Sequence, residues 1–136
     1  MRYEGIKGVP VFDCEEFDDK RTDYCLLIPI INEGDRIVRE LKRAQAAGVD
    51  RICDIIICDG GSTDGNTGKS LAKYGINTML TKISEGKQGA QLRMGLWWAL
   101  ERGYKGFITI DGNDKDSIED VPSFIQKLEE GYDLVQ

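Results

Sequence analysis

Residues 53–65 read CDIIICDGGSTDG, and this stretch decides the fold that the sequence predicts. The apolar, β-branched run 53–58 is typical of a buried strand, and the polar, glycine-rich loop after it is typical of the end of such a strand. The same pattern begins upstream, where residues 24–30 predict a buried strand and residues 35–47 an amphipathic helix. Strands that alternate with helices in this way indicate repeated β-α units and therefore a parallel sheet.

The alternation continues towards the end of the chain. The sequence predicts helices at about 67–74 and 88–102, strands at 77–83, 106–110 and 133–135, and a last helix that begins between 117 and 121. The second of these helices is expected to bury one stripe of residues, Leu92, Leu96, Ala99 and Leu100. The predicted fold class is α/β, with an open, mainly parallel sheet and helices on both faces.

The composition limits the kinds of partner that the chain is expected to bind. A net charge of -6 over 136 residues disfavours nucleic acid, because phosphate backbones are bound by clustered Lys and Arg. The absence of histidine excludes His-based triads and most catalytic zinc sites. The four cysteines lack C-x-x-C spacing, so reduced core thiols are expected in preference to disulfides or a zinc site. The sequence has neither a secretory signal nor an apolar run near the about 20 residues of a membrane span, which predicts a cytoplasmic location.

Four loops with unusual polar residues follow the predicted strands. They read PIINE at 29–33, DGGSTDG at 59–65, EGKQG at 85–89 and DGND at 111–114. In open parallel sheets, ligands bind outside the carboxyl ends of the strands. The topology alone therefore makes these four loops neighbours at one candidate site.

The loop that begins at Asp59 combines a carboxylate with glycines that let a ligand approach the backbone. A carboxylate accepts hydrogen bonds only, so Asp59 requires an N–H donor. Uracil and guanine present a ring N–H beside a carbonyl and adenine does not, which favours a uridine or guanosine nucleotide if Asp59 binds a base. The alternative has about equal weight: Asp59 or Ser62 would then cap the next helix.

Two further groups of residues favour a diphosphate and its metal. Asp111 and Asn113 present oxygens at a spacing of two residues directly after a strand, which suits Mg²⁺ or Mn²⁺. The alternative for this pair is an acidic turn that caps the last helix. Lys87 and Arg93 lie at the start of a helix, where the helix dipole also favours an anion. Each is equally plausible as a solvated surface charge, and Arg93 also as the partner of a neighbouring carboxylate.

Taken in this order, the motifs PIINE, DIIICDGGSTDG, GKQGAQLRMGL, FITIDGND and GYDLV resemble the family 2 glycosyltransferases, and most closely the dolichol-phosphate mannosyltransferase type. The resemblance covers residues 24–136. It implies the GT-A fold with its Rossmann-like nucleotide-binding half, a UDP- or GDP-linked sugar as donor, and a divalent metal. Residues 1–23 stand outside this pattern and are expected to form a polar, acidic N-terminal arm that can pack on the sheet.

The resemblance also implies roles for individual residues. Pro29 and Glu33 match the first nucleotide-contact motif, Asp59 the residue on the base, Lys87 and Arg93 the basic segment, and Asp111 with Asn113 the D-x-D motif. With their neighbours in the loops, the residues predicted to bind the nucleotide are Pro29, Asn32, Glu33, Asp59, Gly60, Ser62, Asp64, Lys87 and Arg93. Asp111 is the predicted catalytic residue, and Asp111 and Asn113 are the predicted metal ligands.

The implied reaction is a single displacement at the anomeric carbon, in which metal and basic groups stabilise the departing diphosphate. The acceptor would be a polyprenyl phosphate or a saccharide. Asn113 departs from the family by replacing the second acid of D-x-D, and Asp114 or Asp116 is a candidate to assist it. The family's acceptor-binding half would follow the last predicted strand, so the chain is expected to be the donor half of a larger protein that meets a membrane only elsewhere. The alternative is a non-catalytic nucleotide- or metal-binding module derived from a transferase.

Overall fold

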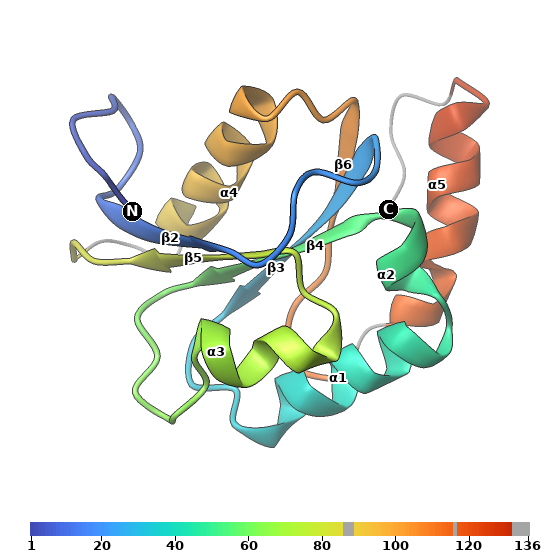
Figure 1. Ribbon diagram of the computed structural model, residues 1–136, viewed down its shortest axis with the longest axis horizontal. Helices are drawn as coiled ribbons and strands as arrows, with labels where there is room; N and C mark the ends of the chain where they lie inside the picture. The colour runs from blue at the N-terminus through green and yellow to red at the C-terminus, as the bar shows by residue number, and fades with distance from the viewer. Residues whose placement is uncertain (86–88, 116, 132–136) are drawn as a thin grey trace.

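The computed structural model describes residues 1–85, 89–115 and 117–131, and within them six strands form one sheet (Figure 1). The strands are β1 (Arg2–Tyr3), β2 (Phe12–Glu16), β3 (Tyr24–Ile30), β4 (Asp54–Asp59), β5 (Thr78–Lys82) and β6 (Gly106–Thr109). Their order is β1-β2-β5-β4-β3-β6. The neighbours among β3, β4, β5 and β6 pair in parallel, whereas β1 and β2 are antiparallel additions. The prediction of an α/β fold with a mainly parallel sheet is confirmed.

The direction in which strands are added reverses after β5. β4 and β5 follow one another on one side of β3, and β6 then returns to pair with the opposite side of β3. As a result, β3 ends between the carboxyl ends of β4 and β6. A reversal of this kind is the place where open α/β sheets bind their ligands. The strand predicted at 133–135 lies outside the described residues.

Helices cover both faces of the sheet, as predicted (Figure 1). One face carries α1 (Asp35–Ala46), α2 (Val49–Ile52), α3 (Gly68–Leu71) and α5 (Val121–Glu129), together with the 3-10 turns η1 (Ala72–Tyr74) and η2 (Ile118–Asp120). The other face carries α4 (Gly89–Glu101). The side chains of β3 pack alternately on the two faces of the sheet: Ile28 packs towards α1, and Leu27 packs towards α4. The apolar runs of the central strands are continuous because both of their faces are buried.

The buried stripe of α4 differs from the predicted one. Ala99 is buried as expected, but Leu100 is 77% exposed. The stripe that contacts the sheet consists of Ala90, Gln91, Met94, Gly95, Trp98 and Ala99. Leu96 is partly buried against the same core, so the prediction was wrong for Leu100. Apolar residues surround much of this helix, and the sequence period alone therefore does not select its buried face. None of the helices in the described ranges is long and apolar enough to cross a membrane.

Gly95 allows α4 to approach β4 closely. A Cβ atom at this position would lie 2.6 Å from the Sγ atom of Cys58, which is closer than real Cβ contacts. The absence of a side chain at Gly95 therefore sets the distance between helix and sheet at this point.

The N-terminal segment belongs to the same sheet. β2 pairs with β5, and β1 pairs with β2 at the edge of the sheet. Phe12 is fully buried on the α4 side of the sheet, and the ring of Tyr3 stacks on it at 5.1 Å between centroids. The amino group of Met1 donates a hydrogen bond to the carbonyl of Cys14 at 2.9 Å. Residues 1–23 therefore add two strands and part of the second core.

All four cysteines are free and buried, which confirms the prediction of reduced core thiols. Burial raises the pKa of Cys14, Cys53 and Cys58 to about 12 in each case. Burial also raises the pKa of Cys25. The thiols therefore stay protonated at neutral pH and behave as small apolar side chains.

Candidate functional site at the carboxyl edge of the sheet

The end of β3 anchors the loops on both sides of it. The N–H group of Gly60, directly after β4, donates to the carbonyl of Ile30 at 2.9 Å. The N–H group of Gly112, after β6, donates to the carbonyl of Pro29 at 3.3 Å. The structure thus brings together the loops after β3, β4 and β6, as the sequence predicts.

Asp59 is the most buried of the predicted site residues described, with 2% of its surface exposed. Its Oδ1 atom accepts hydrogen bonds from the N–H of Gly61 at 3.3 Å, the N–H of Ser62 at 3.0 Å and the hydroxyl of Ser62 at 2.6 Å. Asp59 thus caps its own turn, whereas Thr67 caps the next helix, so this arrangement differs from the helix cap that the sequence left as an alternative. Among the described residues, no group donates a hydrogen bond to Oδ2. The loop therefore fixes the carboxylate through one oxygen and leaves the other without a described donor.

Ser62 and Asn32 join the loop after β4 to the loop after β3. The hydroxyl of Ser62 accepts a hydrogen bond from the N–H of Asn32 at 2.9 Å. In return, Oδ1 of Asn32 accepts from the N–H of Thr63 at 2.8 Å. Asn32 has φ 48, in the left-handed region that asparagine tolerates better than most residues. These two predicted site residues therefore hold each other's loops in place.

Asp64 adds a second connection between the same loops. Its Oδ2 atom accepts from the N–H of Gly34 at 2.8 Å and from Nδ2 of Asn66 at 3.0 Å. Its Oδ1 atom accepts from the N–H of Asn66 at 3.1 Å. Burial acts to raise the pKa of Asp64, but the hydrogen bonds from these N–H groups outweigh it and lower the pKa. Asp64 therefore remains ionised and ties the loop after β4 to the start of α1.

Glu33 lies just before α1 and is partly shielded from solvent. Its Oε2 atom lies 3.0 Å from Nη2 of Arg36, and 15% of its side chain is exposed. The ion pair therefore joins the residue before the N-cap of α1 to the first turn of that helix.

The two predicted basic residues differ in what the structure describes. Arg93 is exposed and its Nε atom donates to the carbonyl of Gly8 at 2.9 Å, in the segment between β1 and β2. Its guanidinium group also lies beside Gly89, at 3.3 Å from the position of an added Cβ. Arg93 therefore connects the first turns of α4 with the N-terminal segment. Lys87 lies outside the described residues.

Gln91 is a residue of this edge that the sequence analysis missed. Its side chain is on the stripe of α4 that faces the sheet, and its Nε2 atom donates to the carbonyls of Ile30 at 2.7 Å and Cys58 at 3.0 Å. The sequence signal is a polar residue at helical spacing from the buried Met94 and Trp98. Such a residue in an apolar stripe requires a hydrogen-bond partner in the core.

Asp111 and Asn113 follow β6 at the neighbouring position of the edge. Asp111 is exposed, whereas Oδ1 of Asn113 accepts a hydrogen bond from the N–H of Lys115 at 3.1 Å. In the described part of the chain, no group of three or more His, Cys, Asp or Glu residues could hold a metal ion. Magnesium is often bound by only one or two carboxylates together with phosphate oxygens. Asp111 and Asn113 are therefore a candidate pair for a hard cation only together with the phosphate oxygens of a ligand.

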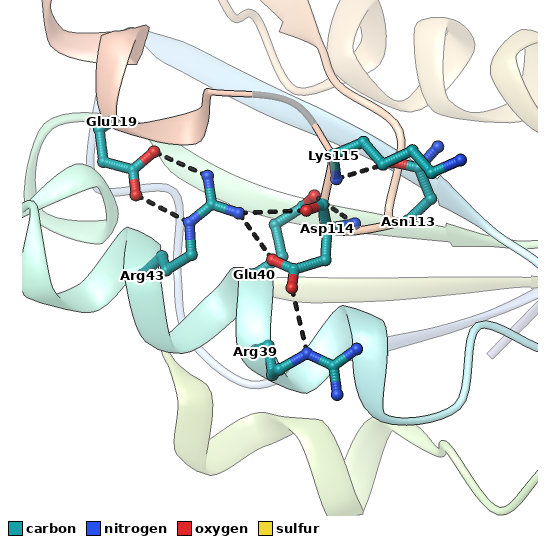
Figure 2. A network of polar contacts seen from close by, with 7 residues as sticks. All are labelled: Arg39, Glu40, Arg43, Asn113, Asp114, Lys115 and Glu119. Carbon is teal, nitrogen blue, oxygen red and sulfur yellow. Dashed lines mark hydrogen bonds and ion pairs between the residues drawn. The ribbon is translucent and has the colours of Figure 1, made fainter.

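A network of charged side chains joins α1 to the loop after β6 and to η2 (Figure 2). The carboxylate of Asp114 accepts from Nη1 of Arg43 at 2.6 Å and from Nε of Arg39 at 3.1 Å. Arg43 also binds both carboxylate oxygens of Glu119, at 2.7 Å each. The N–H of Asp114 donates to Oε1 of the buried Glu40 at 3.1 Å. Asp114, a candidate to assist the metal, thus has both carboxylate oxygens bound to arginines, and Asp116 lies outside the described residues.

The network also shifts the protonation of its members. Hydrogen bonds from Arg43 and then Arg39 lower the pKa of Asp114. A hydrogen bond from Arg43 lowers the pKa of Glu119 to about 2, and the two carboxylates raise the pKa of Arg43. All three groups are therefore charged at neutral pH.

Comparison with known proteins adds no relative to this description. No protein-family model matches the chain, and no curated protein sequence matches it. A fold of this class serves many functions, so the function has to be inferred from the site itself.

Proposed function

We propose that this chain is the donor-binding half of a glycosyltransferase with the GT-A fold, similar to family 2 and to the dolichol-phosphate mannosyltransferase type. The donor would be a UDP- or GDP-linked sugar. The observation that carries this proposal is the carboxylate of Asp59, which is held through Oδ1 by its own loop and has no described donor at Oδ2. A carboxylate fixed in this way is pre-organised to accept an N–H group from a ligand.

In this proposal the base and the diphosphate bind to different loops. Oδ2 of Asp59 accepts the ring N–H of uracil or guanine, and Gly60 lets the nucleotide approach the backbone. Pro29, Asn32, Glu33, Ser62 and Asp64 form the framework of loops around the nucleotide. Lys87 and Arg93 supply positive charge to the diphosphate.

Asp111 and Asn113 would hold Mg²⁺ or Mn²⁺ together with oxygens of the diphosphate. The cation, when bound, supplies positive charge to the leaving group. The acceptor oxygen forms a bond to the anomeric carbon while the bond from that carbon to the diphosphate breaks. Asp111 is the catalytic residue in this proposal because it would hold the metal at the leaving group. For the complete enzyme we propose a polyprenyl phosphate or a saccharide as the acceptor, at the cytoplasmic face of a membrane.

Calorimetric titration with UDP, GDP and ADP tests the proposal, each with Mg²⁺, with Mn²⁺ and with EDTA. We expect UDP or GDP to bind at least about tenfold more tightly than ADP, because adenine leaves the buried carboxylate without a donor. We also expect EDTA to weaken the binding of the preferred nucleotide. Equal affinity for ADP would remove the base contact of Asp59, and no binding of any nucleotide would overturn the donor site.

A second candidate is a non-catalytic nucleotide-binding module derived from a transferase. The hydrogen bond from Lys115 to Oδ1 of Asn113 favours it, because this oxygen already serves the turn. Nucleotide affinity that is equal with Mg²⁺ and with EDTA would support this candidate over the enzyme.

A further inference from the structure

A buried glutamine on α4 bridges the ends of two strands below the candidate site. Gln91 is 7% exposed. Its side-chain amide donates to the carbonyl of Ile30, the last residue of β3, and to the carbonyl of Cys58, the residue before Asp59 on β4. Both hydrogens of the amide are therefore used to connect the two strands.

The carbonyl of Ile30 is shared between Gln91 and the turn after β4. It accepts from Nε2 of Gln91 at 2.7 Å and from the N–H of Gly60 at 2.9 Å. One acceptor thus joins the end of β3, the first turn of α4 and the residue that follows Asp59. A change at Gln91 therefore reaches Asp59 by two routes. One runs through the carbonyl of Ile30 and the N–H of Gly60, and the other through the carbonyl of Cys58 in the peptide that precedes Asp59.

Gly60 also packs directly on the amide of Gln91. A Cβ atom added at Gly60 would lie 2.9 Å from both Cδ and Nε2 of Gln91, and 3.1 Å from its Oε1. The position needs glycine because of this close approach. The backbone at Gly60 is therefore held by its hydrogen bond to the carbonyl of Ile30 and by its packing against the amide of Gln91.

We propose that Gln91 is a positioning residue of the nucleotide site, which fixes the direction in which the chain leaves β4 and thereby the carboxylate of Asp59. The inference rests on the proposed function, because it assigns Gln91 an effect on nucleotide binding through Asp59. Gln91 itself makes no contact with the ligand in this proposal. A purely structural glutamine would contribute to stability and leave affinity and base preference unchanged.

The principal test compares Gln91→Met with Met94→Ala, a change in the same buried stripe one turn further along α4. Nucleotide affinity and urea unfolding are measured for both variants and the unchanged protein, with titrations at a temperature where all three are folded. We expect Gln91→Met to lower the affinity for the preferred nucleotide about tenfold and to reduce its preference over ADP. The reason is that the carbonyls of Ile30 and Cys58 lose their shared donor, so the strand ends no longer fix Asp59. Met94→Ala is expected to lower stability and leave both affinity and preference unchanged.

A double-mutant cycle tests the contact between Gly60 and Gln91. We expect Gly60→Ala to weaken nucleotide binding strongly in the unchanged protein and by at least about threefold less in a Gln91→Ala background, where the added methyl group has room. Equal costs in the two backgrounds would overturn the coupling. Unchanged affinity and preference in folded Gln91→Met would overturn the positioning role.

Amide hydrogen exchange separates failure of this inference from failure of the proposed function. Gln91→Met is expected to accelerate exchange at Gly61 and Ser62, the two N–H donors to Asp59, by about tenfold. The N–H of Asn77, which donates to the carbonyl of Ile55 at the opposite edge of the sheet, is the control. Unchanged exchange at Gly61 and Ser62 overturns the inference whether or not nucleotide binds. If exchange is accelerated but the protein binds no nucleotide, the proposed function is overturned and the role of Gln91 in holding the Asp59 loop stands.

Discussion

The loops after β4 and β6 both place an acidic residue at the carboxyl edge of the sheet, but different interactions hold them. Hydrogen bonds within the loop and from the neighbouring loop hold the Asp59 region, and Asp59 is 2% exposed. Ion pairs to arginines on α1 hold the Asp111 region through Asp114. Hydrogen bonds at buried groups depend little on salt, whereas partly exposed ion pairs weaken with salt and with protonation of the carboxylates. The comparison predicts that the shape of the Asp59 loop depends little on salt and that the order of the Asp111 loop depends on it.

The largest expected effect comes from reversing the hydrogen-bonding character of Oδ2 in Asp59. Asp59→Asn keeps an oxygen for the N–H groups of Gly61 and Ser62 but places an amide donor opposite the N–H of the base. We expect affinity for the preferred nucleotide to fall by about 100-fold in calorimetric titration, because two donors then face each other at a buried position.

The matched control for this change is Asp23→Asn. Asp23 is an exposed acid before β3, at the other edge of the sheet, where it pairs with Lys105 at 3.4 Å. Its substitution removes the same charge and is expected to leave affinity unchanged. Equal affinity of Asp59→Asn and the unchanged protein would remove Asp59 from the nucleotide site.

A smaller effect is expected when the hydrogen bonds of the first loop are removed. Ser62→Ala deletes the 2.6 Å bond to Asp59 and the 2.9 Å bond from Asn32. We expect the free energy of unfolding to fall by about 1–2 kcal/mol in urea titrations. Thr63→Val is the matched control, since the hydroxyl of Thr63 lies 3.4 Å from Asn32 and its loss is expected to change little. Equal losses from the two substitutions would show that Ser62 has no special place in the framework.

The smallest expected effect is the pH dependence of the second loop. The pKa of Glu119 lies at about 2, below its ordinary value of 4.5, because Arg43 binds its ionised form, and the pKa of Asp114 is lowered by the same arginine. A carboxylate with a lowered folded-state pKa contributes stability above its unfolded pKa, and this contribution is lost as the pH falls through the folded pKa. We expect the free energy of unfolding to fall less steeply in Arg43→Met between about pH 4.5 and pH 2.

The control for the pH experiment is Arg51→Met on α2. Among the described residues, Arg51 forms no ion pair, so its loss is expected to leave the slope of stability against pH unchanged. A slope in Arg43→Met that equals that of the unchanged protein would show that the network on α1 does not stabilise the fold.

The parallel part of the fold was predictable because its strands are bounded clearly in the sequence. The structure has β3 at Tyr24–Ile30, as predicted, and every end of β4, β5 and β6 lies within one residue of its predicted position. β2 was not predicted because its sequence, FDCEE, is polar. It becomes a strand through pairing with β5 and burial of Phe12, which are tertiary effects. The four residues of α2 give no periodic signal long enough to detect.

The candidate site was predictable only as a set of neighbouring loops. Topology predicts that the loops at Asp59 and Asp111 are neighbours, and the structure adds that they lie on either side of the end of β3. Sequence does not decide whether Asp59 caps its turn or faces a ligand, because one carboxylate has oxygens for both. The contact between Arg43 and Asp114 joins residues 71 positions apart, which no local pattern specifies. Gln91 was missed for a related reason, since its role depends on which face of α4 meets the sheet.

The close approach at Gly95 has a consequence for the geometry of the whole edge. Cys58 precedes Asp59 on β4, so the residue that would collide with any side chain at position 95 is also the last one before the acidic loop. The distance between α4 and the sheet is thus set at Cys58, one residue before the acidic loop begins. A larger residue at position 95 would separate the two layers, stretch the bridge made by Gln91 and displace the loop without altering any residue proposed to touch a nucleotide.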